Sequence, residues 1–421
     1  MIRKKTIFSI LLAALFTASL TFFYDRFYKA PEVTILGSVK MSDGLGRHPV
    51  ELLQAFKGEI TVGIEHTAIP CFKDIPKNIR GAIKKKYGRQ GKVLIYFDSV
   101  WSPTHSCASY FNEKNPPSQI RIAYSMFESS KIPVEWVSIL NTYFDAVVVP
   151  DEYHVDVYKT CGVDLPVFVL PLVVNLQECL ERPLKKAPSN PFVFGNLSAL
   201  TERKNQLLLI RAFHSAFQNS PDVILKINAR YFSPAYKEKI QKYLDENQIS
   251  NVVLTQECLS KKSYLHFLSN IDCYVSISHG EGFSIQPREA MALGIPTIVS
   301  NNTAQTTIAK SNLALSVDTP ILLPAIYNWN QEESYGNWST CTEKDLADSL
   351  KEMTNNYSSY LKAQAQARAW AAQYDFSHLK PRYKTLLKPT KVELGDQNLI
   401  LSDKIITTSP TLVEKFRSLS R

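Results

Sequence analysis

Motifs that bind metals are missing from this chain of 421 residues. Its seven cysteines are scattered and form no Cys-x-x-Cys pair, which excludes the common zinc and redox motifs. We expect mostly buried thiols, and one disulfide stays open as an alternative. The chain has no His-Glu-x-x-His and no Asp-x-Asp motif. Because a site that holds Mg²⁺ on a diphosphate commonly uses two acidic ligands, we expect no metal and no other cofactor.

Signatures of two further functional classes are also lacking. The chain has neither the Gly-x-Ser-x-Gly elbow of serine hydrolases nor a basic run interleaved with aromatic residues, so neither a Ser/His/Asp enzyme nor a nucleic-acid partner is indicated. The formal net charge is +9, of which residues 1–29 hold +4, five basic residues against Asp25. The remaining excess has two interpretations: ordinary surface charge, or a surface suited to phosphate-bearing substrates or anionic lipid.

A long apolar run stands near the N-terminus. Residues 6–24 carry no charge, are rich in Leu, Ile, Phe and Ala, and follow three basic residues. As a helix this run spans roughly 30 Å of hydrocarbon. A cleaved signal peptide begins similarly, but this run ends in two phenylalanines and Tyr24, not in a small-x-small site. We therefore expect a single transmembrane helix within residues 1–29 as a membrane anchor. Similar Lys/Arg counts on its two flanks leave the side of the membrane open.

Strand-like and helical segments alternate from residue 30 to residue 175. The first strand is expected at 32–40 and is followed by the glycine turn 43–47, Asp-Gly-Leu-Gly-Arg, before an amphipathic stretch. Alternation of this kind indicates a mostly parallel, doubly wound sheet, which makes 30–175 the first domain. Further strand-like runs stand at 92–97, 120–126, 146–150 and 167–170.

A proline-rich stretch of mixed charge, 176–190, breaks this pattern and is predicted to be a linker. A second alternation predicts a second α/β domain over 191–386, and 387–421 is expected to be a tail. The expected elements of this second domain are strands 192–195, 223–227, 252–255, 272–278 and 297–300 and helices 203–218, 234–246, 261–269, 287–293 and 345–373. Ligands of such sheets bind outside the carboxyl ends of the strands, so two facing domains place a site in the cleft between them.

The most specific pattern lies at residues 276–300. A buried strand ends, a loop with Gly280 and Gly282 follows, Pro287 is expected to open a helix, and Gly294 to close it. Loop amides and a helix N-terminus together form a site for negative charge.

Two glutamates flank that site: Glu281 in the loop and Glu289, which is expected in the first helical turn. A carboxylate accepts two hydrogen bonds from vicinal hydroxyls, which suits ribose or a hexose. Each glutamate alone has an ordinary explanation, as a complement to the helix dipole or as a solvated loop residue. Their joint occurrence around a glycine loop favours a nucleotide-sugar site.

A cation pair, Arg203-Lys204, follows the strand 192–195 at the expected start of the next helix, with Ser198 or Thr201 as its cap. Cations are unfavourable at that positive helix end. Their position is explained if an anion binds beside them, and a solvated helix face is the alternative.

The glycines Gly44 and Gly46 follow the first strand of the chain. They do not complete a Gly-x-Gly-x-x-Gly fingerprint, because Pro49 stands at the third glycine position, so a dinucleotide site is only weakly indicated. They allow a tight turn and a close approach of the backbone to a ligand.

From Glu281 to Pro296 the sequence resembles the glycosyltransferases of group 1, family 4, whose E-x7-E signature reads Glu-Gly-Phe-Gly, then Pro, Glu-Ala and Gly-x-Pro. The departures are Ser284 for glycine, Gln286 for proline and Arg288 for an apolar residue. The matching residues are Glu281, Gly282, Phe283, Pro287, Glu289, Ala290, Met291, Ala292, Gly294 and Pro296.

The resemblance extends to Arg203-Lys204-Asn205 and to the glycine turn 43–47, and it covers roughly Val33 to Leu386. It implies the GT-B fold, in which two doubly wound, Rossmann-like domains face each other across a cleft. It also implies transfer of a hexose-type sugar from a nucleotide-diphosphate sugar to an acceptor hydroxyl of a glycan, lipid or protein glycan. The resemblance further implies that the transfer retains the anomeric configuration and needs no metal.

The family's binding residues carry over to matching positions of this chain. Glu289 would bind the donor ribose, and Glu281 would act on the transferred sugar as a catalytic residue. The other implied donor contacts are the amides of Gly282 and Phe283 to the sugar, the amides of Ser284 and Ile285 to the diphosphate, and the side chains of Arg203 and Lys204, which neutralise it.

Two departures in the first half concern the acceptor. Residues 124–128 lack the histidine that many members carry after this strand, and residues 172–175 do not have the usual Asn-Gly-Val-Asp. Glu128 stands where the predicted strand 120–126 reaches the cleft, so we expect it to orient the acceptor hydroxyl or steady positive charge on the sugar. A surface contact near Lys131 is the alternative. Two rival functions also stay open, a nucleotide-sugar epimerase of the same fold and a non-catalytic sugar-binding scaffold.

Overall fold

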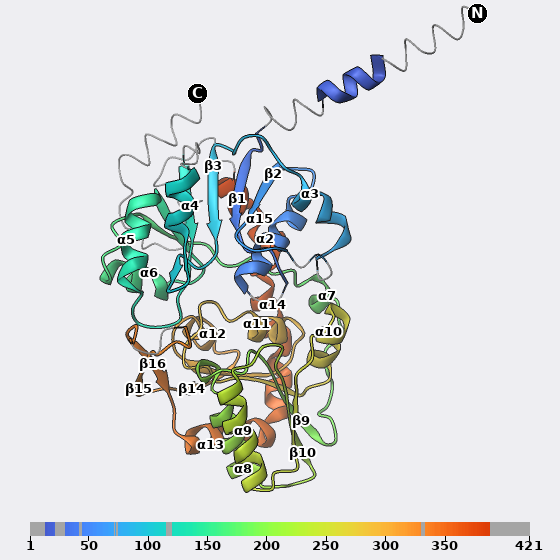
Figure 1. Cartoon of the computed structure of the whole chain (residues 1–421). Coiled ribbons are helices and arrows are strands. Elements are labelled where there is room, and N and C mark those ends of the chain that lie inside the picture. The colour runs from blue at the N-terminus through green and yellow to red at the C-terminus, as the bar shows by residue number, and fades with distance from the viewer. Residues whose placement is uncertain are drawn as a thin grey trace, which may run out of the picture.

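Two α/β domains, one above the other in Figure 1, make up the body of this computed structural model. The structure describes residues 13–21, 30–41, 44–70, 72, 75–114, 120–329 and 333–387. Each domain contains a six-stranded sheet whose paired strands are all parallel. The prediction of two doubly wound, Rossmann-like domains is therefore confirmed.

The N-terminal sheet has the strand order β2-β1-β3-β6-β7-β8. Its strands β1, β3 and β7 are buried along their whole length, as expected for parallel strands with helices on both faces. The strands are β1 (Val33–Gly37), β2 (Val62–His66), β3 (Val93–Phe97), β6 (Ile120–Tyr124), β7 (Ala146–Val149) and β8 (Val167–Val169). The remaining elements are α2 (Gly44–Ala55), η1 (Lys77–Ile79), α3 (Arg80–Lys84), β4 (Trp101–Ser102), β5 (His105–Ser106), α4 (Cys107–Lys114), α5 (Val134–Tyr143) and α6 (Tyr153–Thr160).

The C-terminal sheet has the order β11-β10-β9-β12-β13-β14, with the fully buried β9 and β12 at its centre. Its strands are β9 (Phe192–Leu197), β10 (Val223–Asn228), β11 (Val252–Thr255), β12 (Cys273–Ser276), β13 (Thr297–Asn301) and β14 (Leu315–Asp318). The helices of this half are α7 (Gln177–Leu180), η2 (Glu202–Lys204), α8 (Gln206–Phe217), α9 (Pro234–Glu246), α10 (Lys261–Ser269), α11 (Ile285–Ala292), α12 (Gln305–Ala309), α13 (Glu343–Asn355), α14 (Tyr357–Ala372) and α15 (Phe376–Leu387).

Several observed elements have no counterpart among the predicted ones. They include the edge strands β2 and β14, the short hairpin of β4 with β5, and the antiparallel hairpin of β15 (Ile321–Pro324) with β16 (Asn337–Thr340). These segments are short. Strands β2, β14 and β16 mix apolar and polar residues, and the apolar residues of β15 are mostly exposed, so none shows the buried apolar run that marks the central strands. The single helix expected at 345–373 is two helices, α13 and α14, because Asn356 between them leaves the helical conformation with φ −110° and ψ 19°.

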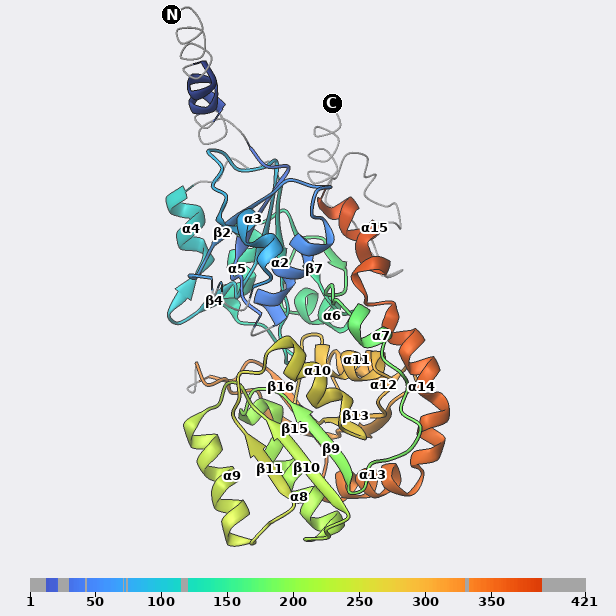
Figure 2. The same cartoon turned by 90° about the vertical axis from the view of Figure 1, so that its right-hand side faces the viewer.

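The last described helices connect the two domains. Figure 2 shows α14 and α15 running along one side of the molecule, from the lower domain to the upper one. Helix α15 packs against α2 of the N-terminal domain. Its fully buried Tyr383 donates a hydrogen bond of 2.7 Å to the carbonyl oxygen of Pro171, and Lys380 forms an ion pair with Glu59. Residues 376–387 thus follow the second sheet in sequence but pack on the first domain.

The predicted transmembrane segment 6–24 is only partly described. Residues 13–21 form a helix, and the rest of the segment lies outside the described residues. A membrane span needs about 20 helical residues, and no helix in the described part of the chain is long and apolar enough to cross a membrane. The prediction of a transmembrane helix therefore finds no support there. Most of the predicted tail, 388–421, also lies outside the described residues.

Candidate active site

The strand order of the C-terminal sheet marks one place for a ligand. Strand β9 pairs with β10 on one side and with β12 on the other, so the chain winds away from this point in both directions. Ligands of doubly wound sheets bind in the crevice at the carboxyl ends of two such strands. The predicted cation pair Arg203-Lys204 follows β9, and Glu281 follows β12. The topology therefore brings these residues to the same crevice from positions 77 and 78 residues apart in sequence.

The cation pair lies in a short 3-10 turn and not at the start of a helix. Arg203 and Lys204 end η2, and Asn205, in the left-handed conformation with φ 59°, separates it from α8. The predicted caps are wrong, because neither Ser198 nor Thr201 makes a capping hydrogen bond. The hydroxyl of Ser198 instead bonds to the Asn196 side chain at 2.8 Å. The turn directs both cations toward the loop after β12.

Glu281 is buried in that loop, and one of its carboxylate oxygens accepts two hydrogen bonds. Its carboxylate accepts from Lys204 Nζ at 2.5 Å and from Ser278 Oγ at 2.6 Å, and its backbone N–H donates to Thr303 Oγ1 at 2.8 Å. Burial alone would raise the pKa of Glu281, but the charges of Lys204 and Arg203 outweigh it and hold the pKa below its usual value. Glu281 is therefore an ionised acceptor at neutral pH, as a carboxylate that binds sugar hydroxyls must be.

Arg203 connects the two domains across the cleft. One of its terminal nitrogens donates to the Gly280 carbonyl at 2.7 Å and lies 3.5 Å from Glu281, while the other lies 3.3 Å from the carboxylate of Glu128. Burial lowers the pKa of Arg203, but Glu128 and Glu281 together raise it above its usual value. The hydroxyl of Tyr327 donates a further bond of 3.4 Å to Glu128. Glu128 thus faces the cleft.

The loop glycines allow this close approach of the domains. A Cβ atom on Gly280 would lie 2.0 Å from the backbone oxygen of Glu128, and one on Gly282 would lie 2.8 Å from the sulfur of Met126. The first contact is with backbone and cannot be relieved by a change of rotamer. Glycine at position 280 is therefore required by contact with the N-terminal domain.

Helix α11 begins at Ile285, two residues earlier than predicted, so Pro287 is its third residue. The helix still tolerates this proline, since the first N–H groups of a helix have no partner within it. Ser284 precedes the helix in the left-handed conformation with φ 66°, and the Gln305 amide holds its hydroxyl at 2.9 Å. Gly294, with φ 75°, ends the helix as predicted.

Because α11 begins earlier, Glu289 lies in its second turn and not in the first. Glu289 belongs to a partly buried cluster whose other members are far from it in the sequence. Arg47 of α2 donates to Glu289 at 2.7 Å and also to Glu51 at 2.7 Å, and the hydroxyl of Tyr264 donates to Glu289 as well. The sequence pattern did not identify Arg47 or Tyr264 as partners, although Arg47 belongs to the glycine turn 43–47.

The predicted glycine turn after β1 is also different in the structure. Gly44 and Gly46 lie in the first turns of α2, so no separate turn precedes the helix at these residues. A Cβ atom on Gly44 would lie 3.4 Å from the side chain of Ile285 at the start of α11. Small residues here bring the start of α2 close to the start of α11, on the opposite wall of the cleft.

Arg288, which departs from the family pattern, is completely buried beneath the loop. Its guanidinium lies over the rings of Phe283, at 4.0 Å, and Tyr374, at 4.5 Å, and bonds to the Ser284 carbonyl at 3.1 Å. It also lies 3.7 Å from Asp151 of the N-terminal domain. Burial raises the pKa of Asp151 to about 6, although Arg288 opposes this shift. Arg288 therefore fixes the glycine loop and joins it to the other domain.

Known proteins match the part of the chain that carries this site. Residues 180–320 match the family model of the glycosyl transferases group 1. Uncharacterized glycosyltransferase MJ1059 of Methanocaldococcus jannaschii is 32% identical over 128 residues, which are 30% of this chain and 30% of the relative. Uncharacterized glycosyltransferase 335 of Sulfolobus islandicus rod-shaped virus 1 is 30% identical over 141 residues, 32% of this chain and 41% of the relative. The matches thus span less than half the length of either relative.

The solved structures include folds similar to the whole described body. Anabaena Alr3699/HepE in complex with UDP and glucose has a TM-score of 0.61 and 12% identity, over 84% of this chain and 99% of that chain. At this identity the likeness concerns the fold, which is GT-B-like. Family 4 and the roles of the individual E-x7-E residues stay predictions. Residues 180–320, which match the family model of the glycosyl transferases group 1, contain both glutamates and the cation pair, in agreement with the resemblance.

Proposed function

We propose that this protein transfers a hexose-type sugar from a nucleoside-diphosphate sugar to an acceptor hydroxyl of a glycan or a lipid-linked glycan. The observation that carries the proposal is the meeting of Arg203, Lys204 and Glu281 at the carboxyl ends of β9 and β12. Both cations lie within 3.5 Å of the ionised Glu281 carboxylate, at the position where doubly wound sheets bind ligands.

The cations account for binding of a diphosphate. A guanidinium has five N–H donors and an ammonium has three. Arg203 and Lys204 can therefore bind phosphate oxygens while they hold Glu281 and the Gly280 carbonyl. The amides of Ser284 and Ile285 at the start of α11 add a helix N-terminus that favours the same negative charge. This arrangement supports charge neutralisation by side chains, and we propose that the reaction needs no metal.

The two glutamates account for the sugars of the donor. Glu281, held ionised beside the cations, is placed to accept hydrogen bonds from the transferred hexose. Glu289 would accept hydrogen bonds from the ribose, with Arg47 and Tyr264 fixing its carboxylate. Binding of UDP and glucose by Anabaena Alr3699/HepE, which has a similar fold, makes a uridine nucleotide the first donor to test.

The N-terminal wall of the cleft would supply the acceptor side. Glu128 lies opposite the donor cations, and we propose that it orients the acceptor hydroxyl or stabilises the positive charge that develops on the sugar. Retention of the anomeric configuration follows from the family resemblance and belongs to the same proposal.

A donor screen tests the proposal. The full chain is incubated with a panel of nucleoside-diphosphate sugars, and release of nucleoside diphosphate is measured with and without EDTA. We expect release from at least one donor, unchanged by EDTA, and a product with the anomeric configuration of the donor. Conversion of the donor sugar into its epimer would instead show an epimerase, and the absence of both reactions would favour a sugar-binding scaffold. Loss of activity in EDTA that Mn²⁺ restores would contradict metal independence.

A further inference from the structure

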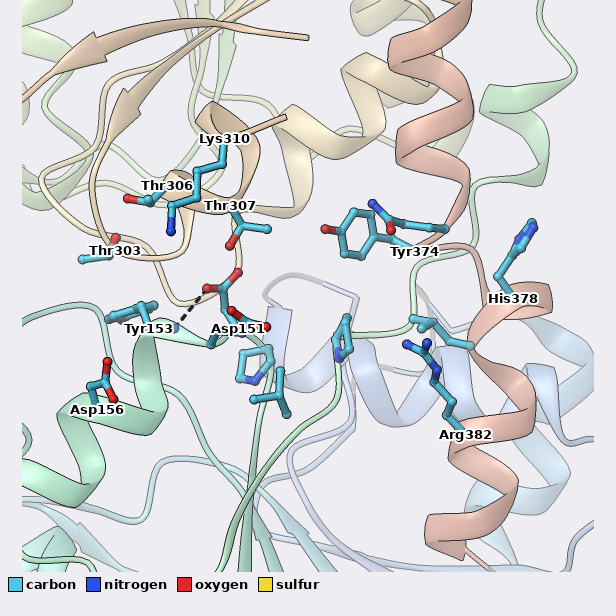
Figure 3. Close-up of a pocket in the computed structure, with 16 residues that line it drawn as sticks. Asp151, Tyr153, Asp156, Thr303, Thr306, Thr307, Lys310, Tyr374, His378 and Arg382 are labelled. Carbon is cyan, nitrogen blue, oxygen red and sulfur yellow. Dashed lines mark hydrogen bonds between the residues drawn. The ribbon is translucent and has the colours of Figure 1, made fainter. Parts of the chain in front are cut away.

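A cavity lies between the two domains, beside the candidate active site. Its volume is about 710 Å³, within the range of small-molecule sites. Figure 3 shows Thr306, Thr307 and Lys310 of the C-terminal domain on one wall and Tyr153 and Asp156 of α6 on another. The α14–α15 region supplies the third wall, with Tyr374, His378 and Arg382.

This cavity is separate from the proposed donor site. None of the residues assigned to the donor lines it. Two of its lining residues nevertheless hold the walls of the active site. Thr303 accepts the hydrogen bond from the backbone of Glu281 at 2.8 Å, and the hydroxyl of Tyr153 donates to the carbonyl of Phe127, the residue before Glu128. A ligand in the cavity would therefore contact Thr303, which bonds to Glu281, and Tyr153, which bonds to the residue before Glu128.

The chemistry of the lining favours an uncharged, hydroxyl-rich ligand. Thr306 presents a hydroxyl that can both donate and accept hydrogen bonds. The hydroxyl of Thr303 donates to Asn302 and that of Thr307 bonds to Asp151, so these two can still accept hydrogen bonds. Tyr153 and Tyr374 add aromatic surface with a polar end, which binds ligands that are partly apolar and partly polar.

The formal charges around the cavity balance. Lys310 and Arg382 are matched by Glu152 and Asp156. The fifth charged residue, Asp151, lies 3.7 Å from the buried Arg288 and is balanced by it. A phosphate or another anion would find no excess of cations here, in contrast to the crevice at Arg203 and Lys204. Carbohydrate combines many hydroxyls, apolar ring faces and no net charge, and so fits all these features.

We propose that this interdomain cavity is a carbohydrate-binding site that holds a non-reacting part of the acceptor glycan. That the bound glycan is the acceptor rests on the proposed transferase function, whereas the binding of carbohydrate rests on the cavity alone. Because the lining comes from both domains, a bound glycan would bridge them. It would also contact Thr303, which supports the Glu281 loop.

Direct binding tests the proposal without any turnover. The full chain is titrated with maltotetraose, cellotetraose and chitotetraose by isothermal calorimetry, in the absence of donor. Thr306→Tyr places a large side chain in the cavity, Thr306→Val removes only the hydroxyl, and Ser358→Tyr adds the same ring at an exposed position of α14 as a control. Circular dichroism shows which variants fold.

We expect at least one oligosaccharide to bind. Thr306→Tyr should weaken that binding at least tenfold, Thr306→Val severalfold, and Ser358→Tyr not at all. Binding by none of the three oligosaccharides, or equal binding by the folded Thr306 variants and the wild type, would overturn the proposal. If the wild type releases no nucleoside diphosphate from any donor, the transferase function fails, while the titration still decides whether the cavity binds carbohydrate.

Discussion

The guanidinium of Arg203 lies 3.3 Å from the carboxylate of Glu128, and this ion pair joins the two domains at the floor of the cleft. One residue follows the central strand of the C-terminal sheet, and the other follows β6 of the N-terminal sheet. The cation proposed to bind the donor diphosphate is therefore held by the carboxylate proposed to act on the acceptor. Each proposed role can be tested by removing one of the two charges.

Replacing either donor cation should weaken nucleoside-diphosphate binding. Arg203→Ala and Lys204→Ala each remove a charge-assisted phosphate contact, worth roughly 1.5–3 kcal/mol, or about ten- to a hundred-fold in affinity. Calorimetry with UDP, or with the diphosphate of the donor found by screening, measures the effect. Lys242→Ala, at an exposed helix position, is the matched control and should bind normally. Unchanged affinity in both site variants would reject the assigned diphosphate site.

Glu128→Gln should lower turnover and leave donor binding intact. We expect a loss of at least tenfold in kcat, about 1.4 kcal/mol of barrier, because the amide cannot stabilise positive charge or accept a proton. Donor affinity should stay equal or rise, since Arg203 no longer shares its charge with a carboxylate. The melting temperature should hardly change, because partly exposed ion pairs contribute little. Normal turnover would give Glu128 a structural role, and weakened donor binding alone would move it to the nucleotide side.

A single methyl group on Gly280 should separate the domains. The added Cβ of Gly280→Ala would lie 2.0 Å from the Glu128 backbone oxygen, and overpacking of this kind costs about 1–3 kcal/mol. We expect a lower free energy of unfolding and a reduced turnover, measured by urea denaturation and by donor consumption. Gly81→Ala in α3 is the matched control, because nothing lies within 4 Å of its added Cβ. If Gly280→Ala is as stable and active as Gly81→Ala, the close contact between the domains is wrong.

Removing Arg288 should raise the pKa of the buried Asp151 further, so that this carboxyl binds a proton at pH 7 in the folded chain. The proton uptake costs up to about 1.4 kcal/mol at pH 7, so Arg288→Met should be destabilised. Adding Asp151→Asn should recover part of that loss. An Arg288→Met protein as stable as the double variant at pH 7 would show that the pair is not coupled.

The same pair sets a pH dependence of stability. The pKa of Asp151, about 6 in the folded chain, lies above its unfolded value of 3.8. A raised pKa gives stability that is fully present below about pH 4 and is lost as the pH rises through 6. Relative to Asp151→Asn, the wild type should therefore lose up to about 3 kcal/mol of unfolding free energy between pH 4 and 7. Parallel pH profiles of the two proteins would contradict this assignment.

The central strands and their order of succession could be predicted from local pattern. Strands β9 and β12 are short apolar runs bounded by polar residues, and each is buried along its length. The edge strand β2 and the hairpin β15–β16 were not predicted in this way, because β2 contains a glycine and two polar residues and the short apolar run of β15 is mostly exposed. Their pairing depends on a neighbouring strand that the local sequence does not specify.

In the candidate site, too, some residues could be predicted from the local sequence and others could not. Glu281, Arg203 and Lys204 could be located because each stands in the short segment that follows a buried strand. The partners of Glu289 could not, since Arg47 is 242 residues away and belongs to the other domain. The same holds for Asp151 opposite Arg288. Such contacts follow from how the two domains dock, and the resemblance gave Arg288 only as a departure from the family pattern.

Turnover by Glu281→Gln tests the central claim most directly. The substitution keeps the size of the side chain and removes the ionised carboxylate that Lys204 and Ser278 hold in place. With the donor that the wild type uses best, release of nucleoside diphosphate by the variant should be at least a hundredfold slower, about 2.7 kcal/mol of barrier. Circular dichroism should show a folded protein. A folded Glu281→Gln variant with near-normal turnover would contradict the assignment of this cleft as a sugar-transfer site.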